Sequence, residues 1–156
     1  MKRLIYIIIA ICICFLLQAG FADIFLLFGI RPDFLLIIVV LLSPSFSSAS
    51  PAGLLGLTCG LLQDAVGISR LGTNGLAKFI IAISIHLVSQ KIYLHRTEIQ
   101  FVIFFLATLI NGIILFLIGI AFQQALPSVF SLFIEGLYNG IFGVLAWKLL
   151  KTVNLL

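Results

Sequence analysis

Few side chains in this 156-residue sequence have the chemistry of a catalytic site. The histidines are His86 and His95, and neither has a second metal-ligating side chain four residues away on the same helix face. The sequence contains no HExxH motif, no GxSxG nucleophile elbow and no glycine-rich phosphate loop. Asp64 has the side chain of an intramembrane aspartyl protease, but no second aspartate stands in a matching motif. We therefore predict a protein that is not an enzyme and binds no metal or cofactor.

Two charged residues, Lys78 and Glu135, fall inside apolar stretches. With a rise of about 1.5 Å per residue, they lie about 10 Å and about 12 Å below the outer ends of their predicted helices. An unpaired charge at that depth costs at least about 2.5–3.5 kcal/mol, so we predict an ion pair between them. Asn111 and Asn139 are candidates to join it through hydrogen bonds between helices. The pair either locks the bundle or lines a polar pocket.

Small residues form two stripes at helical spacing. The first repeats every four residues and ends in an aspartate, and the second lies near the end of the chain. The stripes consist of Ala52, Gly56, Gly60 and Asp64, and of Gly136, Gly140 and Gly143. Such faces let two helix backbones approach closely. They serve either packing within the chain or docking of a partner's transmembrane helix, and two glycine faces would also allow a homodimer.

The composition indicates an integral membrane protein. Hydrophobic residues make up 63% of the chain and charged residues 9%, and the mean hydropathy is +1.34. A soluble domain carries about 25% charged residues, and a chain of this size could not keep so much apolar surface away from water. We interpret the formal net charge of +4 as a topology signal and not as nucleic-acid binding, because no basic, aromatic-rich patch accompanies it.

Continuous apolar stretches predict transmembrane helices of about 20 residues. Four full-length spans are expected at residues 4–22, 71–88, 99–122 and 129–147. Pro44 and Pro51 break the intervening region into two short helices, at residues 33–46 and 51–64, with Ser50 capping the second. These two helices either cross the membrane separately or form a re-entrant hairpin.

The basic N-terminus followed by an apolar stretch also has the outline of a cleavable signal peptide. A retained first span is favoured, because the rest of the chain is itself expected to lie in the membrane.

Charge placement predicts the orientation of six spans. By the positive-inside rule, the side that carries most of the basic residues is cytoplasmic. Those residues are Lys2, Arg3, Lys91, Arg96, Lys148 and Lys151. Both termini are then cytoplasmic, and residues 1–156 form a single transmembrane helical domain. The opposite side is expected to hold a mixed outer charge group of Arg31, Asp33, Asp64 and Arg70.

Two stretches, RPDFLLIIVVLL (residues 31–42) and GLLGLTCGLLQDAVGISRLGTNGLAK (residues 53–78), resemble the MreD family of bacterial rod shape-determining membrane proteins. In that family a Pro-Asp pair opens the second span, a glycine-rich helix ends in an aspartate, and Leu-Gly follows seven residues later. Here these are Pro32-Asp33, Asp64 and Leu71-Gly72. Many members carry Ser-Gly just after the short helix, where this chain has Gly67-Ile68, so the geometry of that loop is expected to differ.

The resemblance implies a non-enzymatic scaffold of the cell-elongation machinery, in the bacterial cytoplasmic membrane, that supports peptidoglycan synthesis. It implies binding to MreC and, through MreC, to RodA, a penicillin-binding transpeptidase and the MreB filament. The family is also similar in structure to the substrate-binding component of energy-coupling-factor transporters. The alternative function is therefore a small-molecule (vitamin) binding subunit, with a pocket near Lys78, Asn111 and Glu135.

Overall fold

The computed structural model describes residues 2–21, 29–67, 70–91, 96–122 and 128–152. All the regular elements in these ranges are helical, which confirms the predicted all-α class. The helices are α1 (Lys2–Leu16), α2 (Phe34–Leu42), α3 (Ala49–Val66), α4 (Thr73–Ser89), α5 (Thr97–Ala121) and α6 (Val129–Thr152). A π-helical segment, η1 (Leu17–Phe21), continues α1, and a 3-10 turn, η2 (Ser43–Ser45), follows α2.

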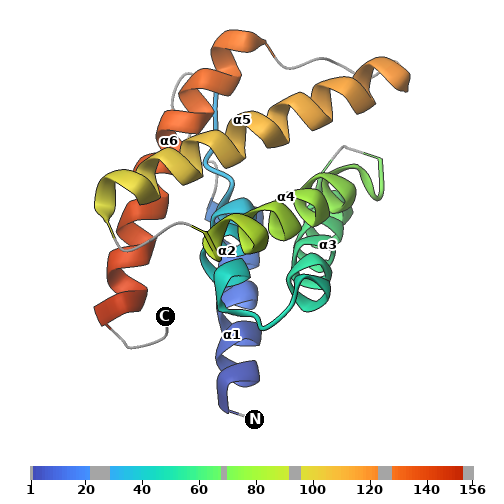
Figure 1. Ribbon diagram of the computed structural model, residues 1–156. Coiled ribbons are helices and arrows are strands. Elements are labelled where there is room, and N and C mark those ends of the chain that lie inside the picture. Colours follow the sequence, from blue (N-terminus) through green and yellow to red (C-terminus); the bar gives the residue numbers. More distant parts are fainter. Residues whose placement is uncertain (1, 22–28, 68–69, 92–95, 123–127, 153–156) are drawn as a thin grey trace.

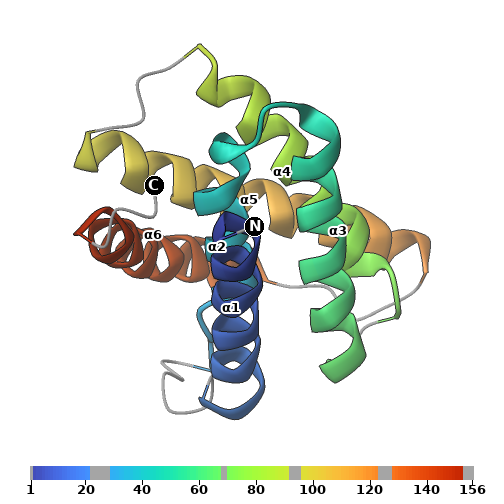
Figure 2. The same cartoon turned by 90° about the horizontal axis from the view of Figure 1, so that it is seen from below.

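The short helix α2 is the core of the molecule. All nine of its residues are buried, and each of the other five helices contacts it. One face, with Ile37 and Val40, packs with Phe104 of α5 and Trp147 of α6. The opposite face, with Leu35 and other aliphatic side chains, packs with α3 and α1. Figures 1 and 2 show α2 in the middle of the bundle from two directions.

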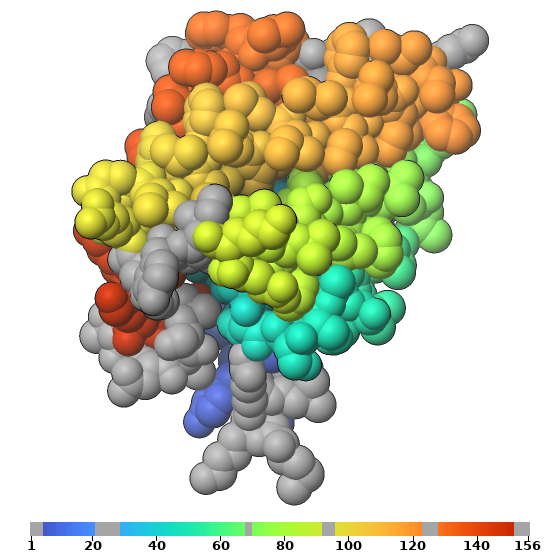
Figure 3. Space-filling model, in the orientation of Figure 1, coloured from blue at the N-terminus to red at the C-terminus, as the bar shows by residue number. Residues whose placement is uncertain are grey.

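Two helix pairs flank this core. The α3 and α4 helices form a closely packed hairpin, and α5 and α6 form a second antiparallel pair, with α5 lying alongside α4 (Figure 1). In Figure 3, α5 and α4 lie one above the other across the face that is shown. The remaining helix, α1, packs on α2.

The outward-facing surface is apolar. Large hydrophobic side chains are exposed along several helices, for example Ile13 of α1 (53%), Leu117 of α5 (59%) and Leu149 of α6 (68%). The interior, in contrast, holds buried polar residues from most of the helices. This distribution is expected for a protein surrounded by lipid, because exposing apolar side chains to lipid costs no free energy.

Two of the described helices are long and apolar enough to cross a membrane, at Thr97–Ala121 and Val129–Lys151. Shorter apolar helices occur at Ile5–Gly20, Phe34–Ser45 and Thr73–Ser89. At about 1.5 Å per residue, the nine residues of α2 cover less than half of a hydrocarbon core of about 30 Å. Because α2 is enclosed by other helices, it does not need the length of a lipid-facing span.

The boundaries of the two central helices differ from those predicted. The chain breaks at Pro44 as expected, within η2. The next helix begins at Ala49 with Ser48 as the N-cap residue, so the predicted cap at Ser50 is wrong. Pro51 lies in the first helical turn, where its missing N–H leaves no hydrogen bond unmade. The helix also continues to Val66, which makes α3 an 18-residue helix.

Candidate functional site

A buried ion pair lies at the start of α2. Lys78 Nζ is 2.7 Å from Asp33 Oδ2, and the two side chains are 0% and 5% exposed. The other carboxylate oxygen, Asp33 Oδ1, accepts the N–H of Leu36 at 2.8 Å and so caps α2. Gln63 Nε2 of α3 also donates to Asp33 Oδ2, at 3.3 Å. One carboxylate therefore begins a helix and neutralises a buried cation.

Hydrogen bonds extend from Asp33 to the outer helices. The N–H of Asp33 donates to Asn139 Oδ1 of α6 at 2.8 Å, and Asn139 Nδ2 donates to Thr108 Oγ1 of α5 at 3.1 Å. The N–H of Phe34 donates to Gln18 Oε1, just after α1, at 2.9 Å. We name this network the polar hub; its side chains are Gln18, Asp33, Gln63, Lys78, Thr108 and Asn139. The polar hub joins all six helices through the first residues of α2.

The predicted partner of Lys78 is wrong. Lys78 is fully buried and paired, as expected, but its partner is Asp33 and not Glu135. The six-span topology predicts Asp33 at the outer surface. In the structure α2 begins inside the bundle, so Asp33 is 4% exposed. Asn139 joins the network as expected, whereas Asn111 Oδ1 is buried without a hydrogen-bond partner among the described residues.

The predicted outer charge group does not form as one exposed cluster. Asp33 and Asp64 are each only 4% exposed. Arg31 and Arg70 are exposed. The Arg70 guanidinium carbon lies 5.1 Å from the centre of the Phe122 ring. This cation–π contact joins the residues just before α4 to the residue just after α5. The carboxylates and the arginines of the predicted group therefore have different environments.

Asp64, at the end of α3, caps the beginning of α4. Its Oδ2 accepts the N–H groups of Gly72 at 2.8 Å, Asn74 at 3.1 Å and Gly75 at 3.2 Å. Its Oδ1 accepts Asn74 Nδ2 at 2.8 Å. A helix N-terminus has unpaired N–H groups and a positive dipole end, so a carboxylate is the matching acceptor.

Gly72 completes this turn with a φ of +96°, a left-handed conformation that favours glycine. The geometry explains how Asp64 and Gly72 act together although they are eight residues apart in the sequence. Part of the intervening loop, residues 68–69, lies outside the described residues, so the expected difference around Gly67-Ile68 is not tested.

The first glycine stripe brings α3 and α4 into backbone contact. A Cβ atom on Gly60 would lie 2.5 Å from Gly75 Cα and would also meet the carbonyl group of Asn74. A Cβ on Gly56 would meet the carbonyl of Lys78 and lie 2.8 Å from Ala82 Cβ. This stripe is occupied by packing within the chain.

The second glycine stripe receives aromatic rings of α5. A Cβ on Gly136 would lie 2.9 Å from Cδ2 of Phe105, and a Cβ on Gly140 would lie 2.6 Å from Cε2 of Phe101. Gly143 faces the ring of Phe104 in the same way. Since both stripes are filled by intramolecular contacts, neither is free to form the homodimer interface that the sequence allowed.

A smaller buried polar group, which the sequence reasoning did not identify, lies at the other end of α4. His86 is 3% exposed; its Nδ1 is 3.3 Å from the carbonyl oxygen of Ser43 and its Nε2 is 3.0 Å from Gln90 Nε2. This environment anchors η2 to α4 and is that of a structural histidine. His95 lies outside the described residues. No group of three or more metal-ligating side chains occurs in the described part of the chain.

These features define a class: a helical bundle with an apolar exterior and a buried polar hub, as expected of a membrane protein. The family model for the rod shape-determining protein MreD matches residues 1–153. The chain therefore belongs to the MreD family, a membrane protein family of rod-shape determination that is not known for enzymatic activity. No curated protein and no solved structure matches the chain.

Proposed function

We propose that this protein is a non-enzymatic scaffold of the bacterial cell-elongation complex that docks MreC. The family match is the observation that carries this proposal. Through MreC the scaffold would act indirectly on RodA, a penicillin-binding transpeptidase and the MreB filament, and so support peptidoglycan synthesis. The internal use of both glycine stripes limits where a partner helix can dock, and leaves the outer faces of the helices.

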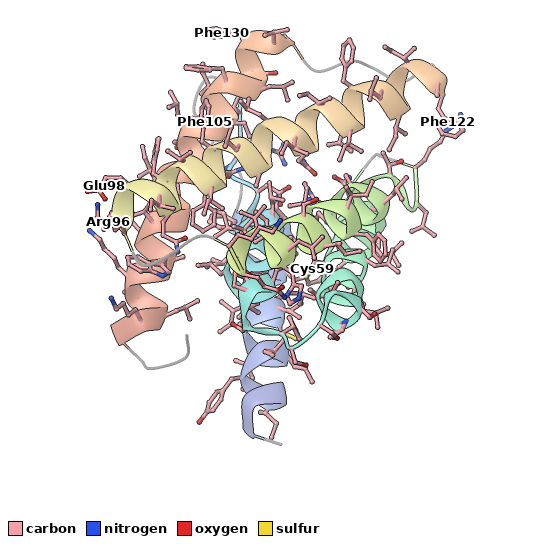
Figure 4. All side chains as sticks on the ribbon, in the orientation of Figure 1. Cys59, Arg96, Glu98, Phe105, Phe122 and Phe130 are labelled. Atoms are coloured by element: carbon pink, nitrogen blue, oxygen red, sulfur yellow. The ribbon has the colours of Figure 1, made fainter. Side chains whose placement is uncertain are left out.

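The outer side of the α5–α6 pair is the docking surface that the geometry supports best. An open groove of about 490 Å³ runs between the beginning of α5 and the second half of α6. Its lining consists of Thr97, Glu98, Phe101, Val102, Ile141, Val144 and Leu145. Glu98 and Arg96 lie at the beginning of α5, at one end of the α5–α6 pair (Figure 4). In the proposed orientation Glu98 faces the cytoplasmic side, where transmembrane helices commonly carry basic residues, so its charge favours a partner helix with a lysine or arginine there.

In the proposed topology the protein crosses the bacterial cytoplasmic membrane six times, with both termini in the cytoplasm. The enclosed position of α2 supports a full crossing that is shorter than usual, because α2 is shielded from lipid by the surrounding helices. A fold like that of the substrate-binding component of energy-coupling-factor transporters remains a proposal.

Disulfide crosslinking in native membranes tests the docking surface. In a variant in which the three free cysteines are replaced by alanine, a cysteine at Ile141 or Val102 should crosslink to cysteines along the MreC transmembrane helix. Leu54 on α3, which is 58% exposed, provides the matched control and should not crosslink. Crosslinking at Leu54 and none in the groove would contradict the docking surface. Purification with ATPase subunits and a bound vitamin, without MreC, would contradict the scaffold function itself.

A further inference from the structure

Asn111 of α5 has a buried amide oxygen without a hydrogen-bond partner in the described part of the chain. The residue is 3% exposed, and its Oδ1 accepts no hydrogen bond from the described part of the chain. An amide that stays buried and unpaired is unfavourable unless something else supplies its hydrogen bonds. Asn111 Oδ1 therefore points to a hydrogen-bond donor that the described part of the chain does not provide.

The helix register places Glu135 of α6 beside Asn111. Thr108 and Asn139 form a hydrogen-bonded rung between the two antiparallel helices. Asn111 lies three residues after Thr108, and Glu135 lies four residues before Asn139, so both belong to the same facing surfaces one turn along. The contact of Gly112 with Leu132 shows that the two helices continue to face each other beyond this point. Asn111 and Glu135 are thus the next facing positions along α5 and α6, and no hydrogen bond joins them.

The two buried side-chain atoms that lack a hydrogen-bond partner among the described residues, Asn111 Oδ1 and Gln63 Oε1, are both acceptors. Glu135 is half-buried, and no hydrogen bond or ion pair joins it to the described residues. The nearest buried cation, Lys78, is committed to Asp33 at 2.7 Å. Gln63 Oε1, beside the ion pair, is also buried without a partner. The missing component is therefore a hydrogen-bond donor, and the unpaired carboxylate favours one with a positive charge.

We propose that Asn111 and Glu135 form a binding site for a primary ammonium or guanidinium group. Glu135 neutralises the charge, and Asn111 Oδ1 accepts one of its N–H groups. The ion pair of the polar hub keeps Lys78 from closing the site. This inference goes beyond the scaffold function and does not depend on MreC, because the site would be present in the isolated protein.

Thermal unfolding in lipid nanodiscs tests this site, with the fluorescence of the single tryptophan, Trp147, as the readout. In phosphatidylglycerol nanodiscs, ethylammonium chloride at about ten times its dissociation constant should raise the unfolding midpoint by about 3–6 °C. Tetramethylammonium, which has a charge but no N–H group, should not. Both Glu135→Gln and Asn111→Leu should lose the response, whereas Glu98→Gln, which removes an exposed carboxylate elsewhere on α5, should keep it.

A second lipid composition distinguishes the two sources of such a group. If a lipid headgroup supplies it, phosphatidylethanolamine in the nanodiscs should raise the midpoint itself and abolish the response to ethylammonium. If a free amine or guanidinium compound is the ligand, the response should persist in both compositions. No shift of the wild-type protein in phosphatidylglycerol, an equal shift with tetramethylammonium, or an unchanged shift in Glu135→Gln would overturn the proposal.

Discussion

The α3–α4 hairpin and the α5–α6 pair both use glycine, but the contacts differ in kind. In the hairpin, Gly56 and Gly60 face the backbone of α4, including the carbonyl groups of Lys78 and Asn74. In the α5–α6 pair, the glycines of α6 face phenylalanine rings of α5, such as Phe101 opposite Gly140. Glycines at the same spacing thus pack against the backbone of the neighbouring helix in the α3–α4 hairpin, and against aromatic rings of the neighbouring helix in the α5–α6 pair.

Because of this difference, the α3–α4 hairpin is the rigid half of the molecule and the α5–α6 pair is the adaptable half. Backbone atoms cannot move aside without displacing a whole helix, and Asp64 additionally fixes the start of α4 to the end of α3. A ring such as that of Phe101, which is half-buried at the edge of the outer groove, can turn about its side-chain bonds. The adaptable pair also carries the proposed docking groove, where a partner helix would require side chains to adjust.

The largest effect is expected from breaking the ion pair that joins α4 of the rigid half to the start of the central helix α2. Lys78→Met leaves the Asp33 carboxylate buried and unpaired, which should lower the free energy of unfolding by about 3–5 kcal/mol. The measurement is unfolding in detergent, with Lys91→Met, at an exposed position, as the control. Adding Asp33→Asn should restore much of the loss, because asparagine can still cap α2. Combining Lys78→Glu with Glu135→Lys should not restore stability.

Gly60→Ala should separate α3 from α4. The new methyl group would lie 2.5 Å from Gly75 Cα, so the expected loss is in the upper part of the about 1–3 kcal/mol range for overpacking. The gain of about 1 kcal/mol in helix propensity does not offset it. Gly20→Ala is the control, because nothing lies within 4 Å of a Cβ at that position. Equal stability of the two variants would show that the hairpin is not a rigid backbone interface.

Asp64→Ala should loosen the first turn of α4 without unfolding the bundle. The N–H groups of Gly72, Asn74 and Gly75 lose their acceptor, and the loss of a helix cap costs about 0.5–2 kcal/mol. Hydrogen exchange should therefore quicken at Gly72, Asn74 and Gly75 but not in the middle of α4. Uniform quickening along α4 would indicate a global effect and not a cap.

The smallest effect is expected at Gly140→Ala in the adaptable half. Rotation of the Phe101 ring can relieve the contact, and a gain of about 1 kcal/mol in helix propensity opposes the remaining strain. The net change in the free energy of unfolding should stay within about 1 kcal/mol. A loss as large as that of Gly60→Ala would remove the distinction between the two interfaces.

The sequence allowed the helices and the glycine faces to be predicted, because apolar length and helical spacing are local properties. It also predicted that Lys78 is buried and paired, since a lone charge in an apolar stretch requires a partner. It did not predict that partner, because depth was counted along each helix from its end. The count fails for Asp33, whose helix begins inside the bundle.

The polar hub could not be predicted from the sequence, for a related reason. Gln18, Gln63 and Thr108 are far apart in the sequence, and nothing in their spacing relates one to another. Only the packing of the outer helices around α2 brings them to Asp33, Phe34 and Asn139. Pro32-Asp33, at the start of the second apolar stretch, was the sequence feature that marked this position.

A pair of double-mutant cycles tests most directly whether Asp33 and Lys78 form the ion pair at the centre of the polar hub. The first cycle combines Asp33→Asn with Lys78→Met, and the second combines Glu135→Gln with Lys78→Met, with the free energy of unfolding measured for every variant. The structure predicts a coupling of at least about 1 kcal/mol in the first cycle and less than about 0.5 kcal/mol in the second. A negligible coupling between Asp33 and Lys78, with a large coupling between Glu135 and Lys78, would contradict the polar hub.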